Sequence, residues 1–209
     1  MIVAICAGGP IEEVAFSLTP NKWIGVDRGA LYLIEQQIIP DTIVGDFDSV
    51  TEAEFARISA SVTHIEQFQA EKDETDTDLA LRRALHYKPT EIWLTGVSGG
   101  RLDHYEATLR TIYRMQSQYS SIKFKIINLQ NEISFLLPGM HTLKKSYYNY
   151  ISFFAYGQKL EQVTLRGVKY ETTNEIIEQG TSRFTSNEII ADGSISFKGG
   201  ICLMIMSKD

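Results

Sequence analysis

Two carboxylates separated by one residue, Asp46 and Asp48, follow a short apolar run in the segment IVGDFDSV at 43–50. Such a run, ending in glycine and paired acids, is typical of a buried parallel strand that delivers charge to the carboxyl edge of a sheet. Open α/β sheets bind their ligands at that edge. Neighbouring carboxylates repel each other, so a divalent cation such as Mg²⁺, often with a phosphate-bearing substrate, is the simplest partner. The alternative is that one acid only caps the next helix.

More acids lie in the segment KDETDTDLAL at 72–81. Interaction with a helix dipole explains one or two acids at a helix start, but not four of them crowded together. Asp73 and Asp76 are about one helical turn apart, so they form the better candidate pair of metal ligands. Asp78 faces away from Asp76 on a helix, and we expect it to be solvated.

A glycine-rich segment, GVSGGRLDH at 96–104, follows one predicted strand and opens a predicted helix. Glycines in such a loop let the backbone approach a phosphate, and the free amides of a helix N-terminus favour negative charge. Arg101 can clamp a phosphate through two parallel hydrogen bonds. Asp103 can bind metal, orient His104 or simply cap the helix, and the spacing does not choose among these roles. Gly8 and Gly9, after the first predicted strand, give a weaker indication of the same kind.

These candidate groups require a framework of alternating strands and helices. Apolar runs predict parallel strands, and segments with helical spacing lie between them. The alternation over the first part of the chain predicts a mostly parallel sheet with helices on both faces. The strands are expected within 1–9, 22–27, 42–49, 62–68, 91–96 and 121–129, and the helices within 28–38, 51–60, 76–87 and 102–116.

The pattern changes near Gln130, after which short β-rich runs follow one another and no segment has convincing helical spacing. Glycines and polar turns separate these runs at short intervals, which is typical of a small antiparallel sandwich or barrel. We therefore predict an α/β domain at 1–128 followed by a small antiparallel β-sandwich domain at 129–209.

Composition narrows the functional classes. The chain has 209 residues, 44% hydrophobic and 22% charged, and a formal net charge of -6. This charge gives no global basic field that would favour nucleic acid or an anionic membrane, so neither is expected as a partner. Cys6 and Cys202 lie in apolar runs near opposite ends, which favours buried free thiols over a disulfide. With no long apolar segment or leader pattern, a cytoplasmic location is expected.

Taken together, the motifs resemble the thiamine pyrophosphokinase family. The matching segments are GVDRGA at 25–30, PDTIVGDFDS at 40–49, DETDTDLAL at 73–81, TGVSGGRLDH at 95–104 and TSNEI at 185–189. Their order and spacing agree over nearly the whole chain. The resemblance implies transfer of a pyrophosphoryl group from ATP to the hydroxyl of thiamine, giving thiamine diphosphate and AMP, with Mg²⁺. It also implies an α/β domain followed by a β-sandwich, and a homodimer with its active site near the subunit interface.

The resemblance also assigns roles to residues. The acids expected to serve catalysis are Asp46, Asp48, Asp73, Asp76 and Asp103, of which the first four would also hold the metal. ATP would be bound by Asp27, Arg28, Gly29, Thr75, Gly99, Gly100, Arg101 and His104. Arg28 stands where many family members have glycine, and a phosphate contact is expected of it. Ser186 and Asn187 would contact thiamine from the β domain.

Two other interpretations stay open on sequence alone. DFDSV resembles the nucleophile motif of haloacid-dehalogenase-like phosphatases, although that motif usually follows the first strand and two predicted strands precede it here. The second alternative is a nonenzymatic module that senses a nucleotide or thiamine. The large number of acids argues against it, because a binding module needs fewer of them.

Overall fold

The computed structural model describes residues 1–62, 64–67 and 75–209. The chain divides into two compact units. Unit 1 contains Met1–Met115 and Ser121–Leu129, and unit 2 contains Gln116–Ser120 and Gln130–Asp209. The domain boundary predicted between residues 128 and 129 stays a prediction.

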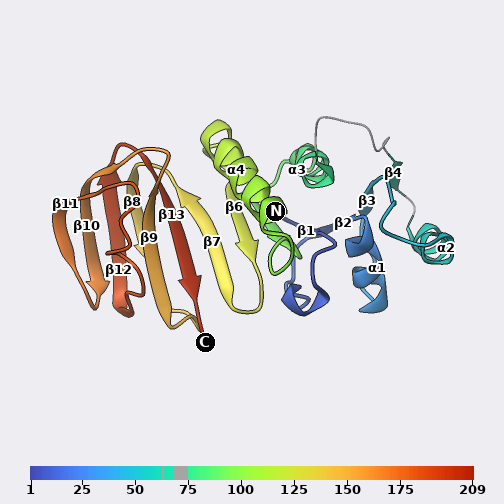
Figure 1. Ribbon diagram of the computed structural model, residues 1–209, viewed down its shortest axis with the longest axis horizontal. Helices are drawn as coiled ribbons and strands as arrows, with labels where there is room; N and C mark the ends of the chain where they lie inside the picture. Colours follow the sequence, from blue (N-terminus) through green and yellow to red (C-terminus); the bar gives the residue numbers. More distant parts are fainter. Residues whose placement is uncertain (63, 68–74) are drawn as a thin grey trace. The chain divides into compact units, whose positions relative to one another are not determined.

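Unit 1 contains a sheet whose strands all pair in parallel, in the order β4-β3-β2-β1-β5-β6 (Figure 1). The strands are β1 (Ile2–Cys6), β2 (Lys22–Val26), β3 (Thr42–Gly45), β4 (Ile65–Gln67), β5 (Glu91–Thr95) and β6 (Lys123–Ile127). β1, β2 and β3 are buried along almost their whole length, which explains why they are continuous apolar runs. The chain runs outward in one direction from β1 to β4 and in the other through β5 and β6. The order therefore reverses between β1 and β5, and such a switch point opens a crevice at the carboxyl ends of the strands.

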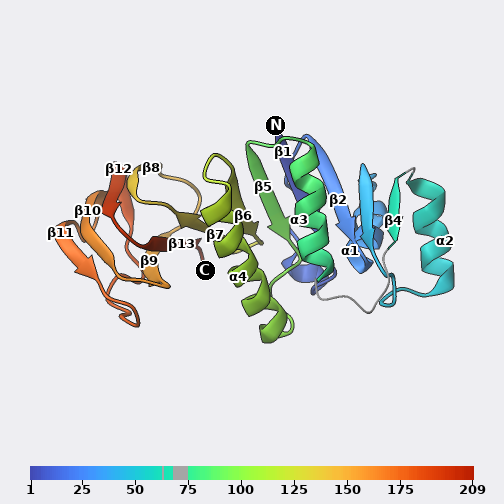
Figure 2. The ribbon, with the colours of Figure 1, turned by 90° about the horizontal axis from the view of Figure 1, so that it is seen from above.

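Helices cover both faces of this sheet. α3 and α4 lie on one face and α1 and α2 on the other (Figures 1 and 2). The helical elements are η1 (Ile11–Glu13), α1 (Arg28–Glu35), α2 (Glu52–Ser61), α3 (Asp76–His86) and α4 (Leu102–Gln118). α2 begins at a capping box, in which Thr51 and Glu54 satisfy each other's backbone N–H groups.

Unit 2 contains two groups of antiparallel strands, ordered β7-β13-β9 and β11-β10-β12-β8 (Figure 1). The strands are β7 (Asn131–Leu136), β8 (Gly139–Leu143), β9 (Tyr150–Tyr156), β10 (Leu160–Val168), β11 (Thr172–Ile177), β12 (Ile189–Lys198) and β13 (Ile201–Ser207). One hydrophobic cluster joins Phe153 and Met204 of the first group to Val163 and Ile195 of the second. Two sheets therefore share a core, and the predicted fold class, a mostly parallel α/β unit followed by a small antiparallel β-sandwich, is confirmed.

Both cysteines are free and buried, as the sequence indicated. Burial raises the pKa of each thiol to about 12, so neither is a reactive thiolate near neutral pH. Among the described residues, no helix is long and apolar enough to cross a lipid bilayer.

Candidate active site

A pocket of about 600 Å³ opens at the carboxyl ends of the parallel strands of unit 1. Segments that directly follow β1, β2, β3 and β5 line it, together with the first turns of α3 and α4. The pocket therefore lies at the switch point that the strand order defines. Its size suits a small molecule, and it is walled by backbone, hydroxyl, carboxylate and guanidinium groups.

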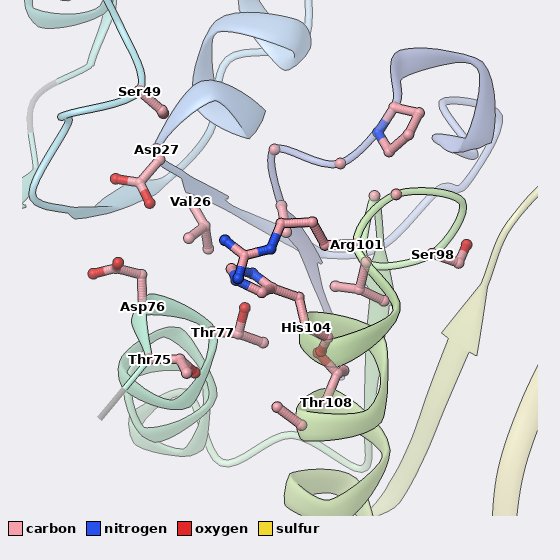
Figure 3. A pocket seen from close by; sticks show the side chains of 18 of the residues that line it. Val26, Asp27, Ser49, Thr75, Asp76, Thr77, Ser98, Arg101, His104 and Thr108 are labelled. Atoms are coloured by element: carbon pink, nitrogen blue, oxygen red, sulfur yellow. The ribbon is translucent and has the colours of Figure 1, made fainter. Parts of the chain in front are cut away.

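Three carboxylates converge on one side of this pocket. Asp27 follows β2, Asp46 follows β3 and Asp76 is the first residue of α3. One carboxylate oxygen from each lies within 4.8 Å of the other two. Figure 3 shows the Asp27 and Asp76 side chains facing the same space from different elements. An all-oxygen donor set of this charge and spacing fits a hard divalent cation such as Mg²⁺.

Gly45, the last residue of β3, makes room for the Asp27 carboxylate. A Cβ atom on Gly45 would lie 1.9 Å from Asp27 Oδ1, and its φ of +153° is one that residues with side chains rarely adopt. The Phe47 N–H then donates to Asp27 Oδ1 at 3.1 Å. Asp27 itself has a φ of 46°, an uncommon backbone conformation outside glycine. The glycine of the VGDFDS motif is thus required by the neighbouring strand's acid.

Burial and the neighbouring acids raise the pKa of Asp27 to about 7. Burial contributes most, the negative charge of Asp76 adds to it, and Asp46 and Asp48 contribute less. The Phe47 N–H opposes the shift because it stabilises the carboxylate. A bound cation would reverse this balance, since it favours the ionised form of every acid in the group.

The opposite side of the pocket carries the Arg101 guanidinium and the His104 imidazole, from residues at the start of α4 (Figure 3). Thr75, which caps α3, lines the pocket beside Asp76. Gly8 and Gly9, which gave only a weak indication in the sequence, line it as well, as does Gly100. Negative charge on one side and Arg101 on the other give the pocket the polarity that a metal-bound polyphosphate requires.

None of the other predicted acids that the structure describes belongs to this group of three. Asp48 lines the pocket but is exposed and outside the group of three, and its backbone N–H donates to Asp46 Oδ1 at 3.0 Å. Asp103 does not line the pocket, and its exposed carboxylate pairs with Arg101 at 2.6 Å. Asp73 lies outside the described residues. The expectation that Asp78 is solvated was wrong: its side chain is 14% exposed and pairs with Arg114 at 2.6 Å.

Two residues predicted to bind ATP have other contacts in the structure. The Arg28 guanidinium donates to the Ser49 carbonyl oxygen and lies 3.6 Å from the Glu54 carboxylate, so it ties the loop after β3 to α1. A Cβ atom on Gly29 would lie 2.1 Å from the Cys6 carbonyl oxygen, so this glycine lets α1 pack closely on β1. Neither residue lines the pocket, nor does Gly99.

The two residues predicted to contact thiamine lie next to each other in unit 2. Ser186 is exposed, and its backbone N–H donates to Ser152 Oγ at 2.9 Å. Asn187 is 4% exposed, and its amide both accepts from the Tyr170 N–H and donates to the Tyr170 carbonyl, each at 2.9 Å. Asn187 therefore joins the turn between β10 and β11 to the TSNEI segment, and Ser186 is left as the more accessible of the pair.

Sequence reasoning missed several hydroxyl residues that line the pocket: Ser49, Thr77, Ser98 and Thr108. Each lies within a few residues of a recognised motif. Motif context could therefore have found the region, but not which side chains face inward.

The fold defines a class of α/β proteins that have an acidic pocket at the switch point of a parallel sheet and an antiparallel β unit later in the chain. Residues 18–125 match the family model described as thiamin pyrophosphokinase, catalytic domain, and residues 140–202 match its vitamin B1 binding domain. The chain belongs to the thiamine pyrophosphokinase family.

Individual relatives agree with this assignment. The thiamine pyrophosphokinase of Bacillus subtilis (strain 168) is 38% identical over 213 residues, covering 99% of both chains. The crystal structure of the Bacillus subtilis enzyme superposes with a TM-score of 0.93 over 100% of both chains. A family protein from Enterococcus faecalis, 33% identical, gives 0.89 over 100% of this chain and 99% of that one. The comparisons support neither a phosphatase nor a nonenzymatic module.

The raised pKa of Asp27 predicts how the metal-free protein responds to pH. Between the ordinary pKa of 3.8 and about 7, the folded state holds a proton that the unfolded state has lost. The free energy of unfolding should therefore fall as pH rises through this window, by on the order of 2 kcal/mol after allowance for solvent screening. Urea unfolding in chelator at several pH values measures it.

Asp27→Asn should remove most of this slope, because the amide does not titrate over the window. Asp192→Asn, a change at an exposed acid of unit 2, is the matched control and should keep it. An unchanged slope in the Asp27 variant would show that other groups set the pH dependence.

Proposed function

We propose that this protein transfers the pyrophosphoryl group of ATP to the hydroxyl of thiamine, giving thiamine diphosphate and AMP, at the pocket of unit 1. The observation that carries the proposal is the convergence of Asp27, Asp46 and Asp76 at the switch point of the sheet. Membership of the thiamine pyrophosphokinase family names the reaction. Incubation with ATP, Mg²⁺ and thiamine should yield thiamine diphosphate and AMP in equal amounts. Release of ADP, or a trapped phospho-aspartate, would contradict the proposal.

Asp27, Asp46 and Asp76 would hold one divalent cation, with Asp48 at the edge of the site. When bound, Mg²⁺ supplies neutralisation of the charge on the phosphate oxygens. Asp73 and Asp103 are also proposed to serve catalysis, on the resemblance of their motifs alone. Arg101 lines the pocket across from Asp27 and Asp76, and its guanidinium is suited to clamp the polyphosphate. To do so, it would release the Asp103 carboxylate and bind phosphate oxygens in its place. Thr75, Gly100 and His104 would add hydrogen bonds that hold the chain of phosphates in one orientation.

Positioning accounts for most of the expected catalysis. Pyrophosphoryl transfer requires the β-phosphorus of ATP in line with the attacking hydroxyl, and fixed charges around it lower the barrier without reorganising. The three acids and Arg101 come from separate elements of a rigid parallel sheet, which suits them for this task. An ionised carboxylate of the group could also accept the hydroxyl proton.

Residues 140–202 match a family model described as a vitamin B1 binding domain, which supports our proposal that Ser186 contacts thiamine. Asn187 would act by holding the TSNEI segment in place, because its amide is already bonded to Tyr170. A homodimer with the active site near its interface is proposed from the family resemblance. Light scattering at working concentration tests it, and a fully active monomer would contradict it.

Removal of divalent cations should abolish turnover, and Mg²⁺ should restore it. Asp76→Asn should lower kcat/KM by about a hundredfold, because the amide weakens cation binding where charge must be neutralised. Asp192→Asn, the same change at an exposed acid of unit 2, is the matched control and should stay within about twofold.

Binding of the cation can be followed without turnover. Mg²⁺ should raise the unfolding temperature of the wild-type protein and of the Asp192 variant, but much less that of the Asp76 variant. Equal stabilisation of all three proteins would place the cation elsewhere.

A division of labour between the units is also expected. Arg101→Ala should weaken ATP binding about tenfold, because it removes charge-assisted phosphate contacts, and should leave thiamine binding unchanged. Ser186→Ala should do the reverse. Calorimetric titration of each ligand measures both, with Arg110→Ala as the control, since Arg110 is an exposed arginine on α4 paired with Glu106. Equal loss of both ligands in each variant would argue against separate contact residues.

A further inference from the structure

The loops that follow β1 and β5 border the crevice of unit 1, and the backbone already joins them at their bases. The Ala7 N–H donates to the Thr95 carbonyl at 2.9 Å, and the Gly9 N–H donates to the Gly96 carbonyl at 2.8 Å. The Ala15 N–H donates to Thr95 Oγ1 at 2.8 Å. These contacts fix where the loops begin, but they do not reach the tip of the glycine-rich loop.

Three polar side chains hold that tip, and they come from three separate elements. Asn128, directly after β6, donates through Nδ2 to Glu13 Oε2 at 2.7 Å and to Ser98 Oγ at 2.9 Å. The Ser98 hydroxyl donates to Glu13 Oε2 at 3.3 Å. Glu13 ends the η1 helix, and Ser98 lines the pocket. Each member therefore contacts both of the others.

The same glutamate also shapes the loop backbone. A Cβ atom on Gly99 would lie 2.4 Å from Glu13 Cγ, and Gly99 has a φ of +81°. The backbone of Gly99 thus packs directly on the Glu13 side chain, in a conformation that other residues rarely adopt. Gly100 and Arg101 follow at once and line the pocket, so a shift at Ser98 or Gly99 moves them too.

We propose that Glu13 and Asn128 are positioning residues for nucleotide binding: through Ser98 they fix the glycine-rich loop in the shape that presents Gly100 and Arg101 to the phosphates. The proposal rests on the nucleotide site put forward above. Asn128 is 7% exposed, and an amide buried at that level requires partners. An apolar contact would stabilise the fold equally well, whereas a hydrogen-bonded triad fixes a single loop conformation.

An exchange of hydrogen-bonding roles tests the proposal. Asn128→Asp keeps the shape but replaces the donor with a carboxylate that faces Glu13, so the dissociation constant for MgATP should rise about tenfold. Glu13→Gln should have a smaller effect, because its amide oxygen still accepts from Asn128. In the double variant the amide introduced at position 13 can donate to the carboxylate introduced at position 128, while Ser98 Oγ can adapt in either direction. MgATP affinity should then return to within about twofold of wild type, which is strong coupling between the two sites.

Calorimetry with MgATP and separate KM values for ATP and thiamine provide the readouts. Glu12→Gln, a change at the exposed neighbour of Glu13 on the same helix, is the matched control. The proposal predicts a raised KM for ATP, an unchanged KM for thiamine and recovery in the double variant. Glu13→Ala, which leaves Asn128 and Ser98 bonded to each other, gives a second test if the Asn128 variant fails to fold.

The opposite results would overturn the proposal. Unchanged ATP affinity in the folded single variants, or a double variant that shows only the sum of their effects, would make the triad purely structural. If the wild-type protein itself failed to bind MgATP, the proposed function would fail instead, so the two failures are distinguishable.

Discussion

Repulsion between carboxylates is the constraint on which the rest of the site depends. A parallel sheet brings the ends of its strands to one edge, so the acids that follow β2 and β3 are close by construction, and α3 adds a third. Burial contributes most to the raised pKa of Asp27, about 7, and the charges of Asp76, Asp46 and Asp48 add to it. By itself, this clustering of acids does not stabilise the folded protein. The cation proposed for this group would make the arrangement favourable and would link the stability of this sheet edge to ligand binding.

The same edge needs positive charge and backbone donors on its other side, and the fold supplies them at the switch point. From β1 and β5 the chain leads on to opposite sides of the sheet order, toward β2 and toward β6, so the loops after these two strands line the crevice. Arg101 lies in the second of these loops, directly before α4. Unit 2 is built differently from unit 1. Its core is shared between two antiparallel sheets, and the TSNEI segment is held by bonds from Asn187 to the Tyr170 backbone. Both units contain apolar clusters, and the three converging acids lie in unit 1.

Sequence alone predicted the fold class and the acids that line the pocket because each left a local signal. Apolar runs that alternate with segments of helical spacing indicate parallel strands, and acids at the ends of those runs indicate the carboxyl edge of the sheet. The roles of Arg28 and Asp78 could not be predicted in this way. Arg28 interacts with Ser49 and Glu54, and Asp78 pairs with Arg114, which lies 36 residues away on another helix. A charged residue beside a motif looks the same in sequence whether it faces a ligand or a neighbouring helix.

Glycines show why a motif must be tested against packing before a ligand is assigned to it. Gly29 stands in a family motif, but its lack of a side chain lets α1 approach the Cys6 carbonyl, and Gly45 leaves space for Asp27. Gly99, in the loop that the sequence marks for phosphate, packs on Glu13, whose partner Asn128 is 115 residues away in the chain. Within GVSGG, Gly99 therefore meets an internal contact, while Gly100 lines the pocket. The phosphate-binding role proposed for this loop rests on its position at the switch point, opposite the acids, rather than on its glycine content.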